Sequence, residues 1–177
     1  LRDYLVVTRN CDPIELETLR METVNRGFSP GQNHQVSGDL FAESLFDSVI
    51  YVSFQELATR ISHRNTGQAC NDPIADQLLA RISHDENLHM IFYRDVSAVG
   101  FDIAPEQAMR SLHRVLANFQ MPGFVVPEFR RKAVIIAVGG VYDPMIHRDD
   151  VVMPVLKKWG ILERSFSGEA ARYQEGI

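Results

Sequence analysis

Two long stretches without a helix-breaking residue constrain the fold of this chain more than any other feature. They cover residues 41–65 and 73–99, and neither contains an internal Gly or Pro. Between them, Asn71, Asp72 and Pro73 place an acidic N-cap directly before a proline at the first helical position. The sequence therefore predicts two long helices joined by a turn at Asn71, packed side by side in opposite directions.

The rest of the chain carries further helix signals and few strand signals. Helices are expected over residues 13–26 after Asp12, ending at Gly27, over 104–118, from Pro127, and from Asp149 or Asp150 to Trp159-Gly160. Residues 29–38 have the composition of a loop. A β-branched run at 134–138 falls inside a helical frame. The prediction is an all-α fold forming one domain over residues 1–177.

Composition excludes several classes of protein. The 177 residues and 20.1 kDa suffice for one hydrophobic core, and 45% apolar with 23% charged residues is typical of a globular chain. A net charge of -5 argues against nucleic acid as the main partner. No apolar run approaches the roughly 20 residues that span a bilayer. Cys11 and Cys70 form no disulfide framework, so we expect a cytoplasmic protein.

Each long helix has an apolar stripe with a carboxylate in its middle. At helical spacing the stripes are Leu45, Val49, Val52, Glu56, Thr59 and His63 on the first helix, and Ala75, Leu79, Ile82, Glu86, His89 and Tyr93 on the second. A lone ionised carboxylate on a buried face is costly. Each carboxylate is therefore expected to be neutral, paired or bound to a metal.

Spacing brings the two carboxylates to the same depth. Glu56 lies 15 residues before Asn71 (71 − 56), and Glu86 lies 15 residues after it (86 − 71). In an antiparallel hairpin both would lie about 22 Å from the turn. Glu86 and His89 are three residues apart, so one helix can offer both an oxygen and an imidazole nitrogen. Two carboxylates and one imidazole form a ligand set that suits Fe or Mn.

Ordinary roles for these side chains remain open at this point. Glu56 could pair with Arg60 or Arg81, or could extend toward solvent. Thr59 could simply hydrogen-bond its own helix backbone. Asp85, beside Glu86, could belong to a solvated face. A single Glu-x-x-His is a weak signal, and the equal depth of Glu56 and Glu86 makes a metal site about as plausible as these alternatives.

Two motifs resemble those of the soluble acyl–acyl-carrier-protein (acyl-ACP) desaturases. Residues 53–66, Ser-Phe-Gln-Glu-Leu-Ala-Thr-Arg-Ile-Ser-His-Arg-Asn-Thr, look like the signature of that family. Residues 85–89, Asp-Glu-Asn-Leu-His, resemble its second motif, in which an acid, Glu and His are spaced in this way. Supporting matches are Tyr4-Leu5, Met121-Pro122 and Lys158-Trp159. The resemblance runs from residue 1 to about 163 and is strongest to the mycobacterial branch.

The resemblance implies a ferritin-like helical bundle of the di-iron carboxylate type, forming a homodimer. Glu56 would be a terminal carboxylate ligand, Glu86 a bridging carboxylate and His89 a terminal imidazole ligand of two Fe per complete site. Thr59 would face the oxygen side of the irons as a catalytic residue. Asp85 would lie behind the ligands and orient a histidine from the partner helix pair. The implied reaction uses O2 to introduce a cis double bond into an acyl chain on acyl carrier protein, in fatty acid or mycolic acid biosynthesis.

The family carries its other metal ligands upstream, as a Glu on one helix and Glu-Glu-x-x-His on the next. Residues 1–5, Leu-Arg-Asp-Tyr-Leu, resemble the segment that directly follows this second motif. We therefore expect an N-terminally incomplete bundle, the C-terminal portion of a desaturase domain, with half of the ligands. We also expect it to be inactive alone and to self-associate through its uncovered apolar stripes.

Partners follow from the same resemblance. Acyl carrier protein is acidic, so its docking needs a local basic patch. The candidates are Arg130, Arg131 and Lys132, and the pair at residues 157–158; ordinary solvated charges explain each group equally well. A ferredoxin-like electron donor is implied. Two other functions stay open, which are a hydroxylase or oxidase with the same metal site, and a metal-free acyl-carrier-protein-binding or assembly module.

Overall fold

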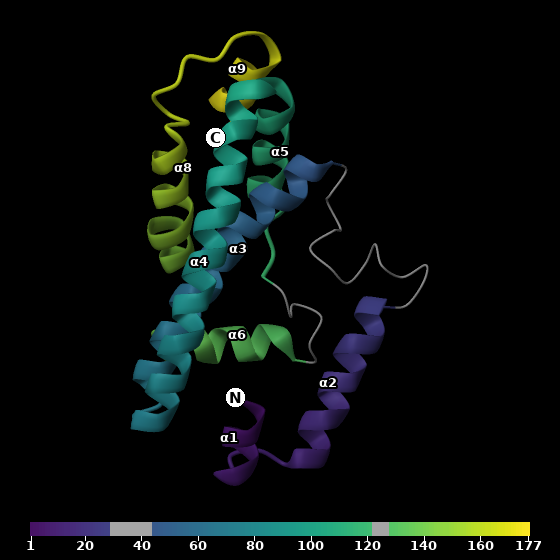
Figure 1. Ribbon diagram of the computed structural model, residues 1–177, viewed down its shortest axis with the longest axis vertical. Coiled ribbons are helices and arrows are strands. Elements are labelled where there is room, and N and C mark those ends of the chain that lie inside the picture. The colour runs from purple at the N-terminus through teal and green to yellow at the C-terminus, as the bar shows by residue number, and fades with distance from the viewer. Residues whose placement is uncertain (29–43, 122–127) are drawn as a thin grey trace.

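The computed structural model describes residues 1–28, 44–121 and 128–177 (Figure 1). Within these ranges all of the regular structure is helical, as predicted. The first helices are α1 (Arg2–Val7), α2 (Pro13–Phe28), α3 (Leu45–Ala69), α4 (Pro73–Ile103) and α5 (Pro105–Asn118), and the later ones are α6 (Phe129–Val138), α7 (Pro144–Ile146), the π-helical turn η2 (His147–Val152), α8 (Met153–Trp159) and α9 (Gly168–Glu175). None of the described helices has a stretch both long and apolar enough to cross a membrane.

Helices α3 and α4 form the predicted antiparallel hairpin (Figure 1). The turn between them contains Asn71 in the left-handed region at φ 51°. The side chain of Asp72 then accepts hydrogen bonds from the backbone N–H groups of Ile74 and Ala75, at 2.8 and 2.9 Å. The cap-plus-proline signal is therefore confirmed as the start of α4.

Both long helices extend beyond their predicted ends. Helix α3 continues to Ala69 instead of about Asn65, and α4 continues to Ile103 instead of about Val99. Gly67 does not break α3, because it is buried against α4, where an added Cβ would lie 3.2 Å from the Cβ of Leu79. The start predicted at Phe41 lies outside the described residues; α3 begins after Ser44.

The start of α3 depends on a capping box that the sequence analysis overlooked. Ser44 Oγ accepts a hydrogen bond from the backbone N–H of Asp47, and Asp47 Oδ2 accepts one from the N–H of Ser44. Asp47 is 2% exposed and also pairs with Arg114 of α5 at 3.0 Å. The same carboxylate therefore caps α3 and ties it to α5.

The core lies where α3, α4, α5 and α8 meet. Trp159, at the end of α8, packs edge-on against Phe54 of α3, with 5.5 Å between ring centroids, and packs against the tilted ring of Phe101 of α4 at 5.2 Å. Its Nε1–H donates to the carbonyl of Arg94 at 2.8 Å. Aliphatic side chains fill the rest, mainly Ile50, Met109, Leu112, Val151, Val155 and Ile161.

The last long helical stretch begins earlier than predicted. Asp143, not Asp149 or Asp150, is the cap, and its side chain accepts a hydrogen bond from the N–H of Ile146 at 2.8 Å. It precedes Pro144 and so repeats the acid-plus-proline signal seen at Asp72. The stretch runs through α7, η2 and α8 and closes at Gly160, with φ 65°, as predicted.

One further helix end needs correction, one helix was not predicted, and two expectations lie outside the described residues. Helix α2 continues through Gly27 to Phe28 instead of ending at Gly27. Helix α9 was not predicted; it is anchored by buried Ala170 and by an ion pair between Arg110 and Glu169 at 2.8 Å. The loop expected at 29–38 and the start expected at Pro127 lie outside the described residues, and α6 begins at Phe129.

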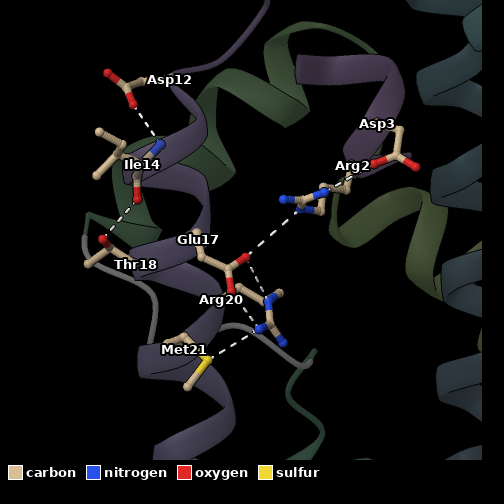
Figure 2. A network of polar contacts seen from close by, with 8 residues as sticks. All are labelled: Arg2, Asp3, Asp12, Ile14, Glu17, Thr18, Arg20 and Met21. Atoms are coloured by element: carbon tan, nitrogen blue, oxygen red, sulfur yellow. Dashed lines mark hydrogen bonds and ion pairs between the residues drawn. The ribbon is translucent and has the colours of Figure 1, made fainter. Parts of the chain in front are cut away.

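Helices α1 and α2 lie at the N-terminal end of the chain and are linked by polar contacts (Figure 2). Glu17 of α2 makes an ion pair with Arg20 at 2.6 Å and lies 3.9 Å from Arg2 of α1. Asp12 caps α2 by accepting from the N–H of Ile14 at 2.7 Å, which confirms the predicted start. All of these side chains are well exposed, so the contacts add little stability.

Candidate metal centre

The α3–α4 hairpin brings Glu56, Glu86 and His89 together. One oxygen or nitrogen atom from each side chain lies within 4.8 Å of the others. Nδ1 of His89 lies 3.5 Å from Oε2 of Glu56 and 3.5 Å from Oε2 of Glu86. The two carboxylates thus lie at one level of the hairpin, as the spacing around Asn71 predicted.

The three side chains differ in their access to solvent. The side chains of Glu56 and Glu86 are 14% and 21% exposed, whereas that of His89 is 59% exposed. The carboxylates are therefore largely withdrawn from water while the imidazole borders an open side of the hairpin. Leu45 is wrongly placed in the buried stripe, because its side chain is exposed at the start of α3.

Burial makes Glu56 an unusual carboxylate. Its Oε2 atom is buried and accepts no hydrogen bond from any residue that the structure describes, although it faces the His89 imidazole. Removal from water raises the pKa of Glu56 to about 7, the adjacent Glu86 contributes in the same direction, and His89 opposes the shift. A buried oxygen without a donor is suited to a proton or to a cation.

The donor set fits a divalent metal ion such as iron. Two carboxylate oxygens and one imidazole nitrogen match the ligand preferences of Fe and Mn. Two adjacent, partly buried carboxylates repel one another unless a proton or a cation neutralises them. The arginine alternatives for Glu56 find no support here. Arg81 approaches Asp85 instead, at 3.8 Å, and Arg60 is exposed.

The structure gives Thr59 and Asp85 ordinary contacts. The hydroxyl of Thr59 donates to its own helix, to the carbonyls of Gln55 at 3.1 Å and Glu56 at 3.0 Å. The side chain of Asp85 is half exposed and lies near Arg81. Their predicted roles, at the oxygen side of the metals and behind the ligands, remain predictions.

The basic candidates for partner binding are exposed at two places. Arg130, Arg131 and Lys132 lie in the first turn of α6, where Arg131 approaches Glu128 at 3.5 Å. Lys157 and Lys158 lie in the last turn of α8 and are also exposed. Exposed basic side chains can dock an acidic partner, and ordinary solvated basic side chains are exposed in the same way.

Sequence reasoning placed His63 on the stripe of α3 without giving it a role. In the structure its Nε2 atom lies 3.9 Å from Oε1 of Glu86, with its side chain 32% exposed. His63 follows Glu56 by seven residues, or about two helical turns, so the two residues share one face of α3. The seven-residue spacing between Glu56 and His63 could have identified His63 as a neighbour of the metal site.

A separate cavity of about 860 Å³ lies beside α6. Most of its lining is apolar, and includes Phe119, Met121, Phe129, Ala133, Ala137 and Pro144. One wall carries a polar pair, in which the hydroxyl of Tyr142 lies 2.7 Å from Nδ1 of His147. The His147 ring stacks on Phe119 at 4.5 Å, and burial lowers the pKa of His147. The size and apolar lining suit a small apolar ligand.

Comparison with known proteins gives consistent results. The family model described as fatty acid desaturase matches residues 1–177. DesA1 of Mycobacterium tuberculosis, which is assigned as an acyl-ACP desaturase, is 76% identical over 178 residues, covering all of this chain and 52% of DesA1. Rice acyl-ACP desaturase 3, a chloroplast protein, is 24% identical over 189 residues, covering all of this chain and 44% of its own length.

A solved structure shares the fold. The X-ray structure of DesA2 from M. tuberculosis H37Rv, assigned as an acyl-ACP desaturase, superposes with a TM-score of 0.74 at 20% sequence identity. The match covers 97% of this chain and 61% of that one. The predicted all-α, ferritin-like architecture is therefore confirmed. The chain spans about half the length of the curated relatives it matches.

Proposed function

Because the chain belongs to the fatty acid desaturase family, we propose that its α3–α4 hairpin binds iron for the desaturation of acyl chains carried on acyl carrier protein. The observation that carries this proposal is the convergence of two partly buried carboxylates and an imidazole within 4.8 Å. The names of the relatives support the reaction and the carrier protein.

Glu56, Glu86 and His89 would hold the metal in this proposal. Iron with O2 and an external electron donor would supply the oxidation that removes two hydrogens from the acyl chain. The residues of the chain fix the ligand atoms and keep water away from the two carboxylates. Because burial raises the pKa of Glu56 to about 7, a cation that binds below that pH has to displace a proton from this carboxyl group.

The finer features of the reaction belong to the same proposal. Thr59 would lie at the oxygen side and Asp85 would orient a histidine outside this hairpin. A complete site would hold two irons, and the enzyme would be a cytoplasmic homodimer that receives electrons from a ferredoxin-like donor. The basic turn at Arg130, Arg131 and Lys132 would dock the acidic carrier protein, since opposite charges steer such encounters. The product would enter fatty acid or mycolic acid biosynthesis.

Metal titration tests the central claim. Anaerobic Fe(II) should bind the chain, and Glu56→Gln or Glu86→Gln should each weaken binding at least about tenfold, because a neutral amide replaces a charged oxygen ligand. Glu22→Gln, on the exposed surface of α2, is the matched control and should bind like the unmodified chain. Equal binding by all of these variants would disprove the site.

The cavity beside α6 is the candidate position for part of the acyl chain. Ala133→Trp would place a large ring in a cavity of about 860 Å³ and should weaken binding of a fluorescent fatty acid about tenfold. Ile136→Trp, also on α6 but exposed and outside the lining, is the control. Unchanged binding by Ala133→Trp would place the acyl chain elsewhere.

A further inference from the structure

The carboxylate of Glu86 lies between two imidazoles that come from different helices. Its Oε2 atom faces Nδ1 of His89 at 3.5 Å, and its Oε1 atom faces Nε2 of His63 at 3.9 Å. His89 belongs to the same helix as Glu86, whereas His63 belongs to α3. Each oxygen of Glu86 therefore has an imidazole of its own.

The direction of side chains on helices explains why Glu86 of α4 lies close to His63 of α3. Side chains lean toward the N-terminus of their own helix, so side chains on two antiparallel helices lean in opposite directions along the hairpin. Glu86 on α4 leans toward the turn at Asn71, and His63 on α3 leans away from that turn. His63 lies seven residues closer to the turn than Glu56, and Glu56 is level with Glu86. The opposite leans of His63 and Glu86 make up for this offset and bring the two side chains together.

We propose that His63 is a positioning residue that donates a hydrogen bond from Nε2–H to Oε1 of Glu86 and so fixes the orientation of the Glu86 carboxylate at the metal site. The proposal rests on the metal site proposed above. The carboxylate group of a glutamate can rotate about its last bond, which changes the direction in which both of its oxygens point. A donor on one oxygen limits that rotation and so holds both oxygens in place, as partners behind metal ligands generally do.

The immediate surroundings favour this role over an ordinary surface one. The side chain of His63 is only 32% exposed. Its neighbour Arg64 points to a different partner and pairs with Asp76. Ser83 of α4 donates to the carbonyl of Arg60 at 2.9 Å, which holds the two helices together close to His63. The backbone on both sides of the pair is thus well anchored, and a shift of about 1 Å would bring Nε2 and Oε1 to hydrogen-bond distance.

Cobalt(II) binding tests the role directly, because Co(II) is spectroscopically visible and accepts the same ligands. We expect His63→Ala to weaken Co(II) binding to the whole chain by about 10- to 100-fold and to alter the visible absorption of bound Co(II). His63→Gln retains an N–H donor and should restore affinity to within about threefold. His84→Ala, an exposed histidine of α4, should change neither property.

Each result has a defined meaning. Unchanged affinity and absorption in His63→Ala, with binding still lost in Glu86→Gln, would overturn the proposal while leaving the metal site standing. A loss in His63→Gln equal to that in His63→Ala would also overturn it, since His63 would then be a ligand itself.

A measurement without metal separates this inference from the proposed function. At about pH 8.5, where ordinary imidazoles are neutral, ¹⁵N spectra should show His63 with its proton on Nε2. Glu86→Ala should change the His63 shifts and leave those of His84 unchanged. If the chain binds no Co(II), the metal site is disproved, and these spectra alone decide whether His63 and Glu86 are paired. A proton on Nδ1 of His63 would overturn the pairing.

Discussion

At the scale of single residues, Glu56 should couple the stability of the metal-free chain to pH. Its folded pKa of about 7 lies above the ordinary value of 4.5, so the folded state binds the proton more tightly than the unfolded state does. This contribution is fully present below about pH 4.5 and is lost as pH rises through 7. Denaturant unfolding in the presence of a chelator should therefore show stability falling over this range, by on the order of 1 kcal/mol from this group.

The matched variant isolates that contribution. Glu56→Gln keeps the size of the side chain but cannot ionise, so its stability should not fall with the same dependence between pH 5 and 8. Glu22→Gln is exposed and should follow the unmodified chain. A Glu56→Gln profile parallel to that of the unmodified chain would show that another group causes the pH dependence.

The three central side chains could be predicted from sequence because helical geometry is regular. Counting from Asn71 placed Glu56 and Glu86 at one level, and the i, i+3 spacing placed His89 beside Glu86. The contact of His63 with Glu86 depends on how side chains lean across two helices, and residue counting does not capture this direction. The hydroxyl of Thr59 could equally bond inward or back to its helix, and no spacing decides between these.

At the scale of elements, close packing at the end of the α3–α4 hairpin far from its turn depends on a glycine. A Cβ added at buried Gly100 of α4 would lie 2.5 Å from a ring carbon of Phe46 on α3. Gly100→Ala should therefore cost about 1–2 kcal/mol of stability, because overpacking outweighs the roughly 1 kcal/mol that alanine adds to helix propensity. Urea unfolding would measure the change.

A second variant shows whether the clash is the cause. In a Phe46→Ala background the same Gly100→Ala change should become stabilising by up to about 1 kcal/mol, since only the propensity gain remains. Destabilisation of equal size in both backgrounds would attribute the effect to something other than the Phe46 ring.

Helix starts were easier to predict than helix ends. Asp12 and Asp72 precede prolines and were identified correctly, whereas Asp143 carries the same signal and was overlooked in favour of Asp149 and Asp150. Ends depend on packing that sequence does not display. Helix α3 continues through Gly67 because this residue packs against α4. Helix α9 forms where Ala170 is buried against the hydrophobic core.

At the scale of the whole molecule, α4 presents an apolar face to solvent. The exposed residues of this α4 face, at helical spacing, are Leu88, Phe92, Val96, Val99 and Ile103. Exposed apolar faces of this kind favour association. We expect sedimentation to show self-association of the chain, and Phe92→Glu to weaken it about tenfold by placing a charge in the middle of the α4 face.

A control elsewhere on the surface makes the test specific. Ile14 is 77% exposed on α2, so Ile14→Glu adds the same charge without touching the α4 face. It should leave the association constant unchanged. A monodisperse monomer at all concentrations, or equal weakening by both variants, would contradict the prediction.

Trp159 is the only tryptophan in the sequence, and it is 1% exposed where α8 meets α3 and α4. Its indole is surrounded by aromatic rings and donates to the carbonyl of Arg94. The chain therefore carries a built-in optical reporter whose emission colour depends on one junction. Any treatment that detaches α8 should turn that emission toward the red, even when the total helix content measured by circular dichroism stays nearly constant.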